Sequence, residues 1–328
     1  MNRRNFLKKS LIASGVITVP FSPNLSLSVI NNPISLGFIA DLHHDIMHDG
    51  FRRLEGFLQA SEKTKPDAII QMGDFAYPNK DNLDVINAFN QAHINSLHVV
   101  GNHDTDNGHT LSQCIDIWGI PHRYYSYVVD RIKILVLDGN DKGSPTYKGG
   151  YPSYIGEEQL SWMVKELEST SLPVIIVSHQ PLAGYISVDN AVQIQNLLSV
   201  HKDKILFAIN GHSHIDHLLC VKDVYYFHVN SASYYWVGGN YKHESYPAEI
   251  HVENPWIEYT CPYQDELFTF ITINPQKQHI EITAKKSNWV HQSPVDIGYV
   301  NDELEVGKEI CPEIRERKFW KFDGCPEP

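Results

Sequence analysis

Five short polar strings carry the residues of this chain that are best suited to chemistry. They are DLH at 41–43, GD at 73–74, GNHD at 101–104, SH at 178–179 and GHSH at 211–214. Together they supply seven candidate metal ligands, namely Asp41, His43, Asp74, Asn102, His179, His212 and His214. Carboxylate, amide and imidazole groups suit divalent transition metals. A set of this size is large enough to hold two metal ions.

An apolar run precedes each of these strings. The runs are ISLGFIA, DAIIQM, LHVV, LPVIIV and KILFAI. Short apolar runs of this kind predict buried strands, and polar residues at strand ends are typical of an α/β sheet with its site at that edge. The candidate ligands are 33 residues apart from Asp41 to Asp74 and 28 apart from Asp74 to Asn102. Each interval fits one strand–helix–strand crossover of about 30 residues.

The segments between the apolar runs have the spacing of amphipathic helices. Helices are predicted over 51–64, 82–93 and 156–170, where apolar residues recur every three or four positions. Strands are predicted on both sides of a turn at Asp130-Arg131 within 124–140, and again over 224–235 and 266–285.

Alternating strands and helices followed by further strands predict two sheets that pack face to face. We therefore expect an α/β fold, a four-layer α/β/β/α sandwich of two mixed sheets flanked by helices. The chain shows no internal repeat and no linker, which favours a single domain over residues 31–290. Residues 291–328 are charged and aromatic, and we expect a C-terminal tail packed on that domain.

The first thirty residues predict an export signal. Arg3 and Arg4 begin a twin-arginine sequence, RRNFLKK, and an apolar stretch follows over 11–21. That stretch is shorter than the roughly 20 residues that span a bilayer, so no stable membrane insertion is expected. No cysteine precedes Cys114, which excludes lipid attachment directly after such a signal. We expect residues 1–30 to engage the twin-arginine export machinery and the protein to be periplasmic or secreted.

The charge of the chain argues against some classes of binding partner. The formal net charge is −12, and the basic residues of the export segment would leave with it. An acidic chain repels nucleic acid and anionic lipid at long range, so neither is an expected partner.

Of the five cysteines, Cys114 and Cys220 stand in apolar surroundings and are predicted to be buried thiols. Cys311 and Cys325 are predicted to form a disulfide.

Hydrolysis of a phosphate ester requires a strong nucleophile, neutralised phosphoryl oxygens and a proton for the leaving group. Two divalent ions about 3.5–4 Å apart can meet the first two requirements through a shared hydroxide. Such a site needs one bridging carboxylate. Asp74 in its GD turn is the natural bridge, and Gly73 allows the backbone to approach closely.

The order Asp-x-His, Gly-Asp, Gly-Asn-His-Asp, His and Gly-His-x-His resembles the calcineurin-like metallophosphoesterase superfamily over about residues 34 to 230. The resemblance implies two ligand sets that share Asp74: for the first metal Asp41, His43, Asp74 and His214, and for the second Asp74, Asn102, His179 and His212. Manganese, iron and zinc all accept these ligands. The resemblance also implies that His103 contacts the phosphate and protonates the leaving oxygen, which suits a group that titrates near neutral pH.

The implied activity is metal-dependent hydrolysis of a phosphodiester or phosphomonoester by a metal-bridging hydroxide. The expected substrate is a small phosphorylated compound, with Asn102 and His44 as candidate contacts. Asp104 is a candidate to orient the neighbouring His103. Asn102 and the metal ions would stabilise the transition state.

Two alternatives stay open. Tyr77 and Pro78 stand where protein serine/threonine phosphatases carry an Asp and an Arg, which argues against that class. The string GDFAY resembles the Gly-Asp-x-x-Tyr of purple acid phosphatases, in which the tyrosine binds ferric iron. Those enzymes have glycine where this chain has His43, so we expect His43 to take that coordination position instead of Tyr77. The second alternative is a binding protein that keeps the fold without catalysis.

Overall fold

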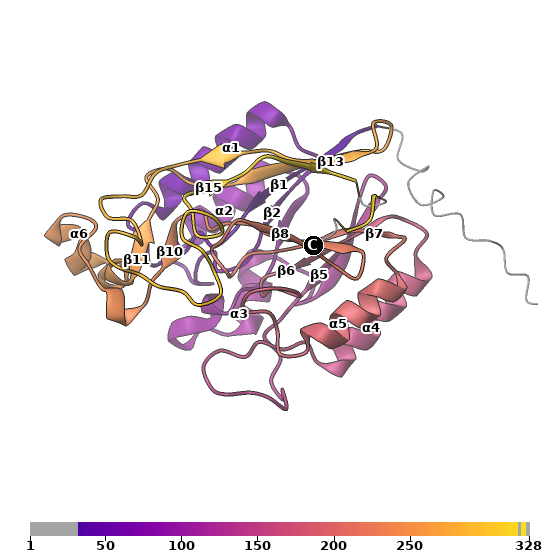
Figure 1. Ribbon diagram of the computed structural model, residues 1–328, viewed down its shortest axis with the longest axis horizontal. Coiled ribbons are helices and arrows are strands. Elements are labelled where there is room, and N and C mark those ends of the chain that lie inside the picture. The colour runs from indigo at the N-terminus through magenta and orange to yellow at the C-terminus, as the bar shows by residue number, and fades with distance from the viewer. Residues whose placement is uncertain (1–31, 321–322, 326–328) are drawn as a thin grey trace, which may run out of the picture.

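The computed structural model describes residues 32–320 and 323–325. The export signal predicted at 1–30 therefore lies outside the described residues. Two six-stranded sheets form the centre of the molecule, and both contain parallel and antiparallel neighbours. Helices cover the outer face of each sheet (Figure 1). This is the predicted four-layer α/β/β/α arrangement.

The first sheet brings three of the predicted strands side by side. Its order is β16-β13-β12-β1-β2-β3. In chain order the strands are β1 (Ile34–Ile39), β2 (Ala68–Gln71), β3 (Ser96–His98), β12 (Thr269–Asn274), β13 (His279–Ile282) and β16 (Arg317–Phe319). Strands β1, β2 and β3 run parallel, whereas β12 pairs antiparallel with β1. The carboxyl ends of the three parallel strands consequently meet at one edge.

The second sheet has the order β4-β5-β6-β7-β9-β8. Its strands are β4 (Tyr125–Val129), β5 (Ile132–Leu137), β6 (Val174–Ser178), β7 (Ile205–Asn210), β8 (His217–Val221) and β9 (Val224–His228). The antiparallel pair β4–β5 turns at Asp130, which confirms the predicted turn. Strands β5, β6, β7 and β9 are parallel, and every side chain of β6 is buried. A strand that is apolar on both faces belongs in a covered sheet of this kind.

The helices supply the two outer layers. They are α1 (Gly50–Thr64), α2 (Leu83–Ala92), α3 (Leu111–Trp118), α4 (Glu157–Ser169), α5 (Ala191–Val200) and α6 (Ala248–Glu253). Figure 1 shows α1 and α2 over the first sheet and α4 and α5 together over the second. Leu160, Met163 and Leu167 of α4 are buried against the second sheet, as the helical spacing predicted. No helix among the described residues is long and apolar enough to cross a membrane.

The strand predicted over 224–235 is two strands that belong to different sheets. Strand β9 ends at His228, and β10 (Tyr234–Trp236) pairs with β11 (Thr260–Pro262) in a small separate sheet. The residues between them leave the strand conformation, because their side chains bond to the backbone of the neighbouring DLH loop. That loop forms part of the candidate site.

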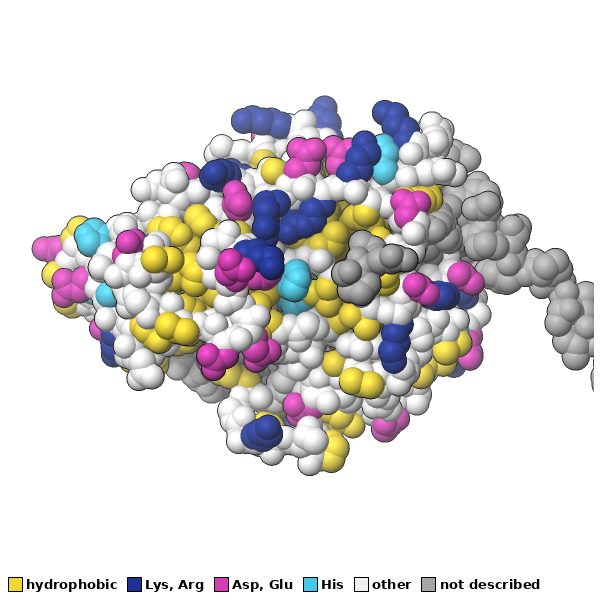
Figure 2. All heavy atoms as spheres, in the orientation of Figure 1, with side chains coloured by type: hydrophobic (Ala, Val, Ile, Leu, Met, Phe, Trp, Pro, Cys, Tyr) yellow, Lys and Arg dark blue, Asp and Glu magenta, His cyan; other side chains and the backbone are white. Residues whose placement is uncertain are grey.

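The C-terminal tail joins the first sheet. Strand β16 extends that sheet beyond β13, and β15 (Glu313–Ile314) pairs with β14 (Lys285–Lys286). Arg315 and Arg317 bond to the fully buried carboxylate of Asp216. Lys and Arg side chains gather over β13 and β15 on the face that Figure 2 shows. The basic character of the tail thus serves partly to neutralise a buried acid.

The disulfide prediction was wrong. Cys325 bonds to Cys220, not to Cys311, and Cys311 is a buried free thiol. Cys220 lies on the edge strand β8, half-buried, where the end of the tail passes beside it. Cys114 is a buried thiol, as predicted. The prediction paired two cysteines that are close in sequence on the tail. In the fold, Cys325 instead bonds to Cys220, which is 105 positions away.

Candidate metal centre

The five polar strings converge because the strands that precede them end at one place. Asp41 and Asp74 follow β1 and β2 of the first sheet, and Asn102 follows β3. His179 directly follows β6 of the second sheet, and His212 follows β7. The carboxyl edges of the two sheets face each other here, so ligands from both sheets surround one space.

The turns after these strands hold unusual backbone conformations. Five of the seven predicted ligands have positive φ: Asp41 (51°), His43 (47°), Asp74 (50°), His212 (66°) and His214 (51°). A non-glycine residue in this region costs of the order of 1 kcal/mol or more, and such residues cluster at functional sites. The strands end in sharp turns that direct these side chains inward.

Close approach of the turns requires glycine before the ligands. Gly73 has φ of 96°, and a Cβ there would lie 2.4 Å from Nδ1 of His179. A Cβ on Gly101 would lie 2.1 Å from Oδ1 of Asp74. The two sheets are also joined directly, because His212 donates its backbone N–H to the carboxylate of Asp41 at 3.0 Å.

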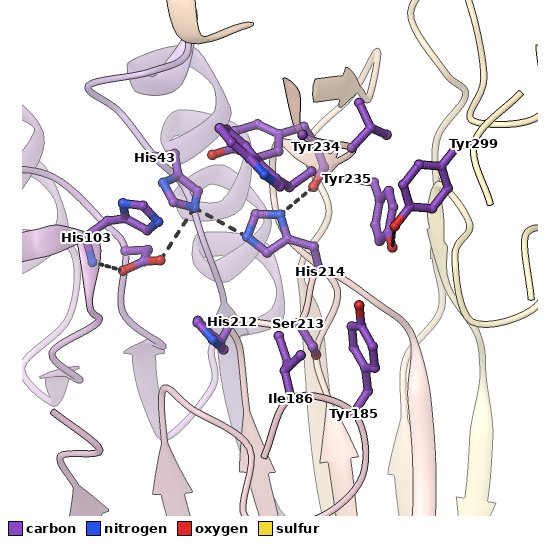
Figure 3. Close-up of a pocket in the computed structure, with 14 residues that line it drawn as sticks. His43, His103, Tyr185, Ile186, His212, Ser213, His214, Tyr234, Tyr235 and Tyr299 are labelled. Atoms are coloured by element: carbon purple, nitrogen blue, oxygen red, sulfur yellow. Dashed lines mark hydrogen bonds and ion pairs between the residues drawn. The ribbon is translucent and has the colours of Figure 1, made fainter. Parts of the chain in front are cut away.

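The ligand atoms form two groups. One contains Asp41, His43 and His214, and the other contains Asp74, His179 and His212. In the first group, Nε2 of His43 lies 3.3 Å from Nε2 of His214 (Figure 3). The same nitrogen of His214 lies 3.4 Å from Oδ1 of Asp41.

In the second group, Nε2 of His179 lies 3.2 Å from Oδ2 of Asp74 and 3.2 Å from Nδ1 of His212. Oδ1 of Asn102 lies 3.1 Å from the same nitrogen. Atoms that bind one ion at about 2.1 Å lie roughly 3 Å from each other, so these separations fit ligation.

Asp74 lies between the two groups. Its Oδ2 is 3.2 Å from Nε2 of His179 and 3.6 Å from Nε2 of His43. Burial opposes charge on this carboxylate, but His179 and His103 outweigh it and hold the pKa of Asp74 well below its usual range. An ionised carboxylate in contact with both groups has the position that a bridging ligand requires.

The hydrogen bonds of two histidines indicate which of their ring nitrogens faces the site, and therefore whether a cation fits between the ligand atoms. Nδ1 of His214 donates to the carbonyl oxygen of Tyr234, and Nδ1 of His179 donates to that of Met72, each at 2.8 Å. The second nitrogen of each ring then presents a lone pair to the site. These lone pairs face the oxygens of Asp41, Asp74 and Asn102 across about 3 Å. Acceptors that converge on acceptors need a cation between them, so the residues fit two metal ions.

The electrostatics lead to the same conclusion. Burial lowers the pKa of His43 and of His212 well below the ordinary value, which keeps both rings neutral as metal binding requires. At His179 burial acts in the same direction, but Asp74 outweighs it and raises the pKa to about 9. The negative potential that would draw a proton to His179 also attracts a metal ion.

His103 lies beside this cluster with its side chain about one-third exposed. Its backbone N–H donates to Oδ1 of Asp74 at 2.8 Å, and its ring centre is 5.4 Å from that of His43. Nδ1 of His103 contacts Oδ2 of Asp106 at 2.7 Å, and the hydroxyl of Tyr151 lies 3.2 Å from the same nitrogen. Burial opposes the charged imidazole, but Asp74 and Asp106 outweigh it and raise the pKa of His103.

The expectation that Asp104 orients His103 was wrong. The fully buried carboxylate of Asp104 accepts backbone N–H groups from Asp74, Phe75 and Gly101 at 2.7 to 2.9 Å. Burial and the nearby Asp74 raise the pKa of Asp104 to about 7. Asp104 therefore ties the GD turn to the GNHD turn, and Asp106, three residues beyond His103, orients the imidazole.

Sequence reasoning also missed three serines that hold the site loops. Ser231 and Ser233 donate to the carbonyl oxygens of Asp41 and Leu42 at 2.9 and 2.7 Å. Ser213, between the two histidines of GHSH, lies 2.8 Å from Nδ1 of the buried His228. The string VNSAS lacks strand alternation, which is the one signal that could have marked these serines as loop residues.

Two further predicted residues belong to neither ligand group. His44 is absent from the described residues that line the clefts at the site, and its Nδ1 lies beside Gly50. Tyr77 lines the space beyond His103, where its ring packs 5.1 Å from that of His109. It also lines a small cavity that His43 and Asp74 share. Its backbone is held by Asp45, which accepts the Tyr77 N–H at 2.7 Å.

Residues 34–216, more than half of the chain, match the calcineurin-like phosphoesterase family. The chain belongs to this family. It is accordingly a hydrolase that acts on phosphoester bonds, and the two ligand groups indicate a dinuclear metal site. No curated protein matches the sequence.

Solved structures share the fold of this phosphoesterase. A dimetal phosphatase from Danio rerio superposes with a TM-score of 0.53 at 13% identity, covering 76% of this chain and 95% of its own. GAP50, the anchor in the inner membrane complex of Plasmodium, superposes with a TM-score of 0.51 at 13% identity, covering 80% and 86%. At this identity the likeness concerns the fold alone.

Two clefts of the phosphoesterase meet at His103. The inner cleft, of about 390 Å³, contains His43, Asp74, His212 and His214 (Figure 3). The outer cleft, of about 450 Å³, contains none of these predicted ligands. His103 and Trp236 line both clefts. The general acid that the family resemblance implies thus stands between the metal ligands and a separate space.

Proposed function

We propose that this protein hydrolyses a small phosphate ester, a phosphodiester or a phosphomonoester, with two divalent metal ions at the described cluster. The observation that carries the proposal is the contact of Asp74 Oδ2 with Nε2 of both His43 and His179. Manganese, iron and zinc all suit this ligand set. When bound, such ions supply an activated hydroxide and neutralise the phosphoryl oxygens.

Asp41, His43, Asp74 and His214 would hold one ion, and Asp74, Asn102, His179 and His212 the other. Asn102 also reaches the phosphoryl group as it passes through the transition state. His103 gives its proton to the leaving oxygen, and Asp106 holds the imidazole in place for that transfer.

The experiment that tests this function measures metal content and hydrolysis together. The mature protein, loaded with Mn²⁺, is assayed on a chromogenic phosphodiester and on the matching monoester. We expect turnover of at least one, and His103→Asn should reduce kcat by about 100-fold or more with unchanged metal content. The matched control is His122→Asn, an exposed histidine that belongs to neither ligand group. A metal-loaded protein inactive on both esters, or His103→Asn as active as the parent, would contradict the proposal.

The twin-arginine sequence supports export to the periplasm or beyond, with the export machinery as a transient partner. The Cys220–Cys325 disulfide supports an oxidising compartment. The test is cell fractionation of the parent and of a variant with Arg3→Lys and Arg4→Lys. We expect the variant to stay in the cytoplasm, and equal export of both would contradict this route.

A further inference from the structure

The outer cleft is built differently from the inner one. Its walls include the rings of Tyr77, Tyr151, Trp236 and Trp256, and His103 and Asp106 stand at its inner end. Its volume of about 450 Å³ is in the range of small-molecule sites. Four of the residues that would hold the metal ions line the inner cleft instead.

The aromatic rings are exposed but firmly supported. Trp236 is 40% exposed and Trp256 is 54% exposed. Tyr259 packs behind both, 5.4 Å from Trp236 at an interplanar angle of 5° and 5.2 Å from Trp256. Exposed aromatic surface gathered at one place marks a binding site more often than a packing defect. Because Tyr259 supports both rings, the stacking surface exists before a ligand arrives.

Tyr151 forms the wall nearest to the chemistry. It is 47% exposed, and its ring centre lies 4.7 Å from that of His103. Its hydroxyl donates to Asp106 at 2.7 to 2.8 Å. Tyr151 is therefore both a wall of the outer cleft and one of the contacts that hold the imidazole of His103.

Charge restricts what the cleft accepts. None of the described residues that line it is Lys or Arg, and it carries the carboxylate of Asp106. A leaving group with further phosphates would find no cation there. Flat aromatic walls favour a planar ring instead, and the side chain of Asn107 at the rim can hydrogen-bond to its polar edge.

We propose that the outer cleft binds the leaving group of the substrate, and that this group carries an uncharged planar ring system of nucleoside size. The inference rests on the proposed function. In the reaction water gives up one proton to solvent and its oxygen bonds to phosphorus, the bond from phosphorus to the leaving oxygen breaks, and His103 protonates that oxygen. The ring-bearing alcohol is then released from the outer cleft.

The test compares leaving groups that differ only in the ring. Adenosine 5′-monophosphate and ribose 5-phosphate share the same primary alkoxide, and their methyl diesters provide the same comparison for a diesterase. We expect kcat/KM to be about tenfold or more higher for the adenosine esters, because stacking strengthens the binding of a base. Trp256→Ala should bring this ratio close to one, whereas Trp256→Phe should keep most of it.

The matched control is Tyr147→Ala, which removes an exposed aromatic ring outside the outer cleft and should leave the ratio unchanged. Equal kcat/KM for the adenosine and ribose esters in the parent would overturn the proposal. Equal losses on both esters in Trp256→Ala would overturn it as well.

A binding measurement separates this proposal from the proposed function. Adenosine, ribose and 1-naphthol are titrated into the Mn²⁺-loaded protein by calorimetry. Adenosine binding that Trp256→Ala weakens about tenfold supports the cleft even if no ester is hydrolysed. Binding of 1-naphthol alone would support the planar ring and exclude a nucleoside, and binding of none of the three would overturn the proposal.

Discussion

Asp106 holds the imidazole of His103 through a 2.7 Å contact between its Oδ2 and Nδ1 of the ring. Both residues belong to the short segment that follows β3, His103–Gly108, whose backbone leaves the helical conformation at Asp106. Because Nδ1 is engaged in this way, Nε2 is the nitrogen that can serve a substrate oxygen. The neighbouring Asp104 is turned away and ties two backbone turns together instead.

Replacing Asp106 should impair proton transfer without removing metal. We expect Asp106→Asn to lower kcat by about tenfold, since the ring loses its charged partner and its fixed tautomer. The loss should be larger for alkyl leaving groups, which need the proton, than for aryl groups. Parallel kcat and metal measurements check this, with the exposed Asp116→Asn as control. Equal losses for alkyl and aryl esters would point to a merely structural role.

Removing metal should destabilise the fold. Asp41 and Asp74 are buried side by side, and without bound cations imidazoles such as His179 are the positive groups available to offset the charge of Asp74. A ligand at 100 times its Kd stabilises a protein by about 2.7 kcal/mol, so a chelator should lower the Tm by several degrees and Mn²⁺ should restore it. Calorimetry of the parent and of Asp74→Asn checks this. The same chelator effect in both proteins would argue against metal at this cluster.

Asp104→Ala should disrupt the site while the sheets persist. The variant leaves the buried N–H groups of Asp74 and Gly101 without their acceptor, at a cost of about 1–3 kcal/mol for each. We expect a lower Tm and metal binding weaker by at least tenfold, measured by calorimetry and metal analysis. A variant with normal metal content would show that the turns hold their shape without this carboxylate.

Stability should fall below neutral pH partly through His98. This fully buried ring accepts an N–H from Gln71 at Nδ1 and donates from Nε2 to Asn90, and burial lowers its pKa to about 3. The neutral form is therefore favoured in the folded state. The stabilisation is complete above the unfolded pKa of about 6.5 and declines by about 1.4 kcal/mol per pH unit below it.

Denaturant unfolding at pH 7 and pH 5 measures this contribution. His98→Gln should reduce the difference between the two pH values, whereas His291→Gln, at an exposed position, should leave it unchanged. An unaltered pH dependence in His98→Gln would assign the acid sensitivity to other groups.

Tyr77→Phe should leave metal binding intact, because His43 occupies the ligand position in the cluster. We expect the iron-loaded parent to lack the purple colour of an iron–tyrosinate site. Visible absorption and metal analysis of the parent and the variant check this. A purple parent that Tyr77→Phe bleaches would favour the acid phosphatase alternative.

The convergence of the candidate metal ligands was predictable because local sequence patterns mark the strands that precede them. Each string stands directly after an apolar run, and crossover spacing of about 30 residues places such strings at one sheet edge. The helices over 50–64, 83–92 and 157–169 followed from apolar spacing in the same way. Periodicity carries this information because one face of each element must be buried.

Long-range contacts between side chains were not predictable in this way. The pairing of Cys220 with Cys325 depends on where the tail crosses β8, and no local pattern records that path. The break after β9 depends on serines that bond to a loop 190 and 191 residues earlier. Tyr259 is close to Trp256 in sequence, but its stacking on Trp236 and the position of both tryptophan rings in one cleft with His103 appear only in the folded chain.

The sequence by itself determined which residue types were available, in which order, and that each follows a strand. Tertiary structure alone decided that Asp74 lies between both ligand groups, that Asp106 and not Asp104 orients His103, and that an aromatic cleft opens beside them. The physical reason is that apolar burial is encoded in short periodic segments. Side-chain direction, by contrast, depends on turns with positive φ and on partners that many residues separate.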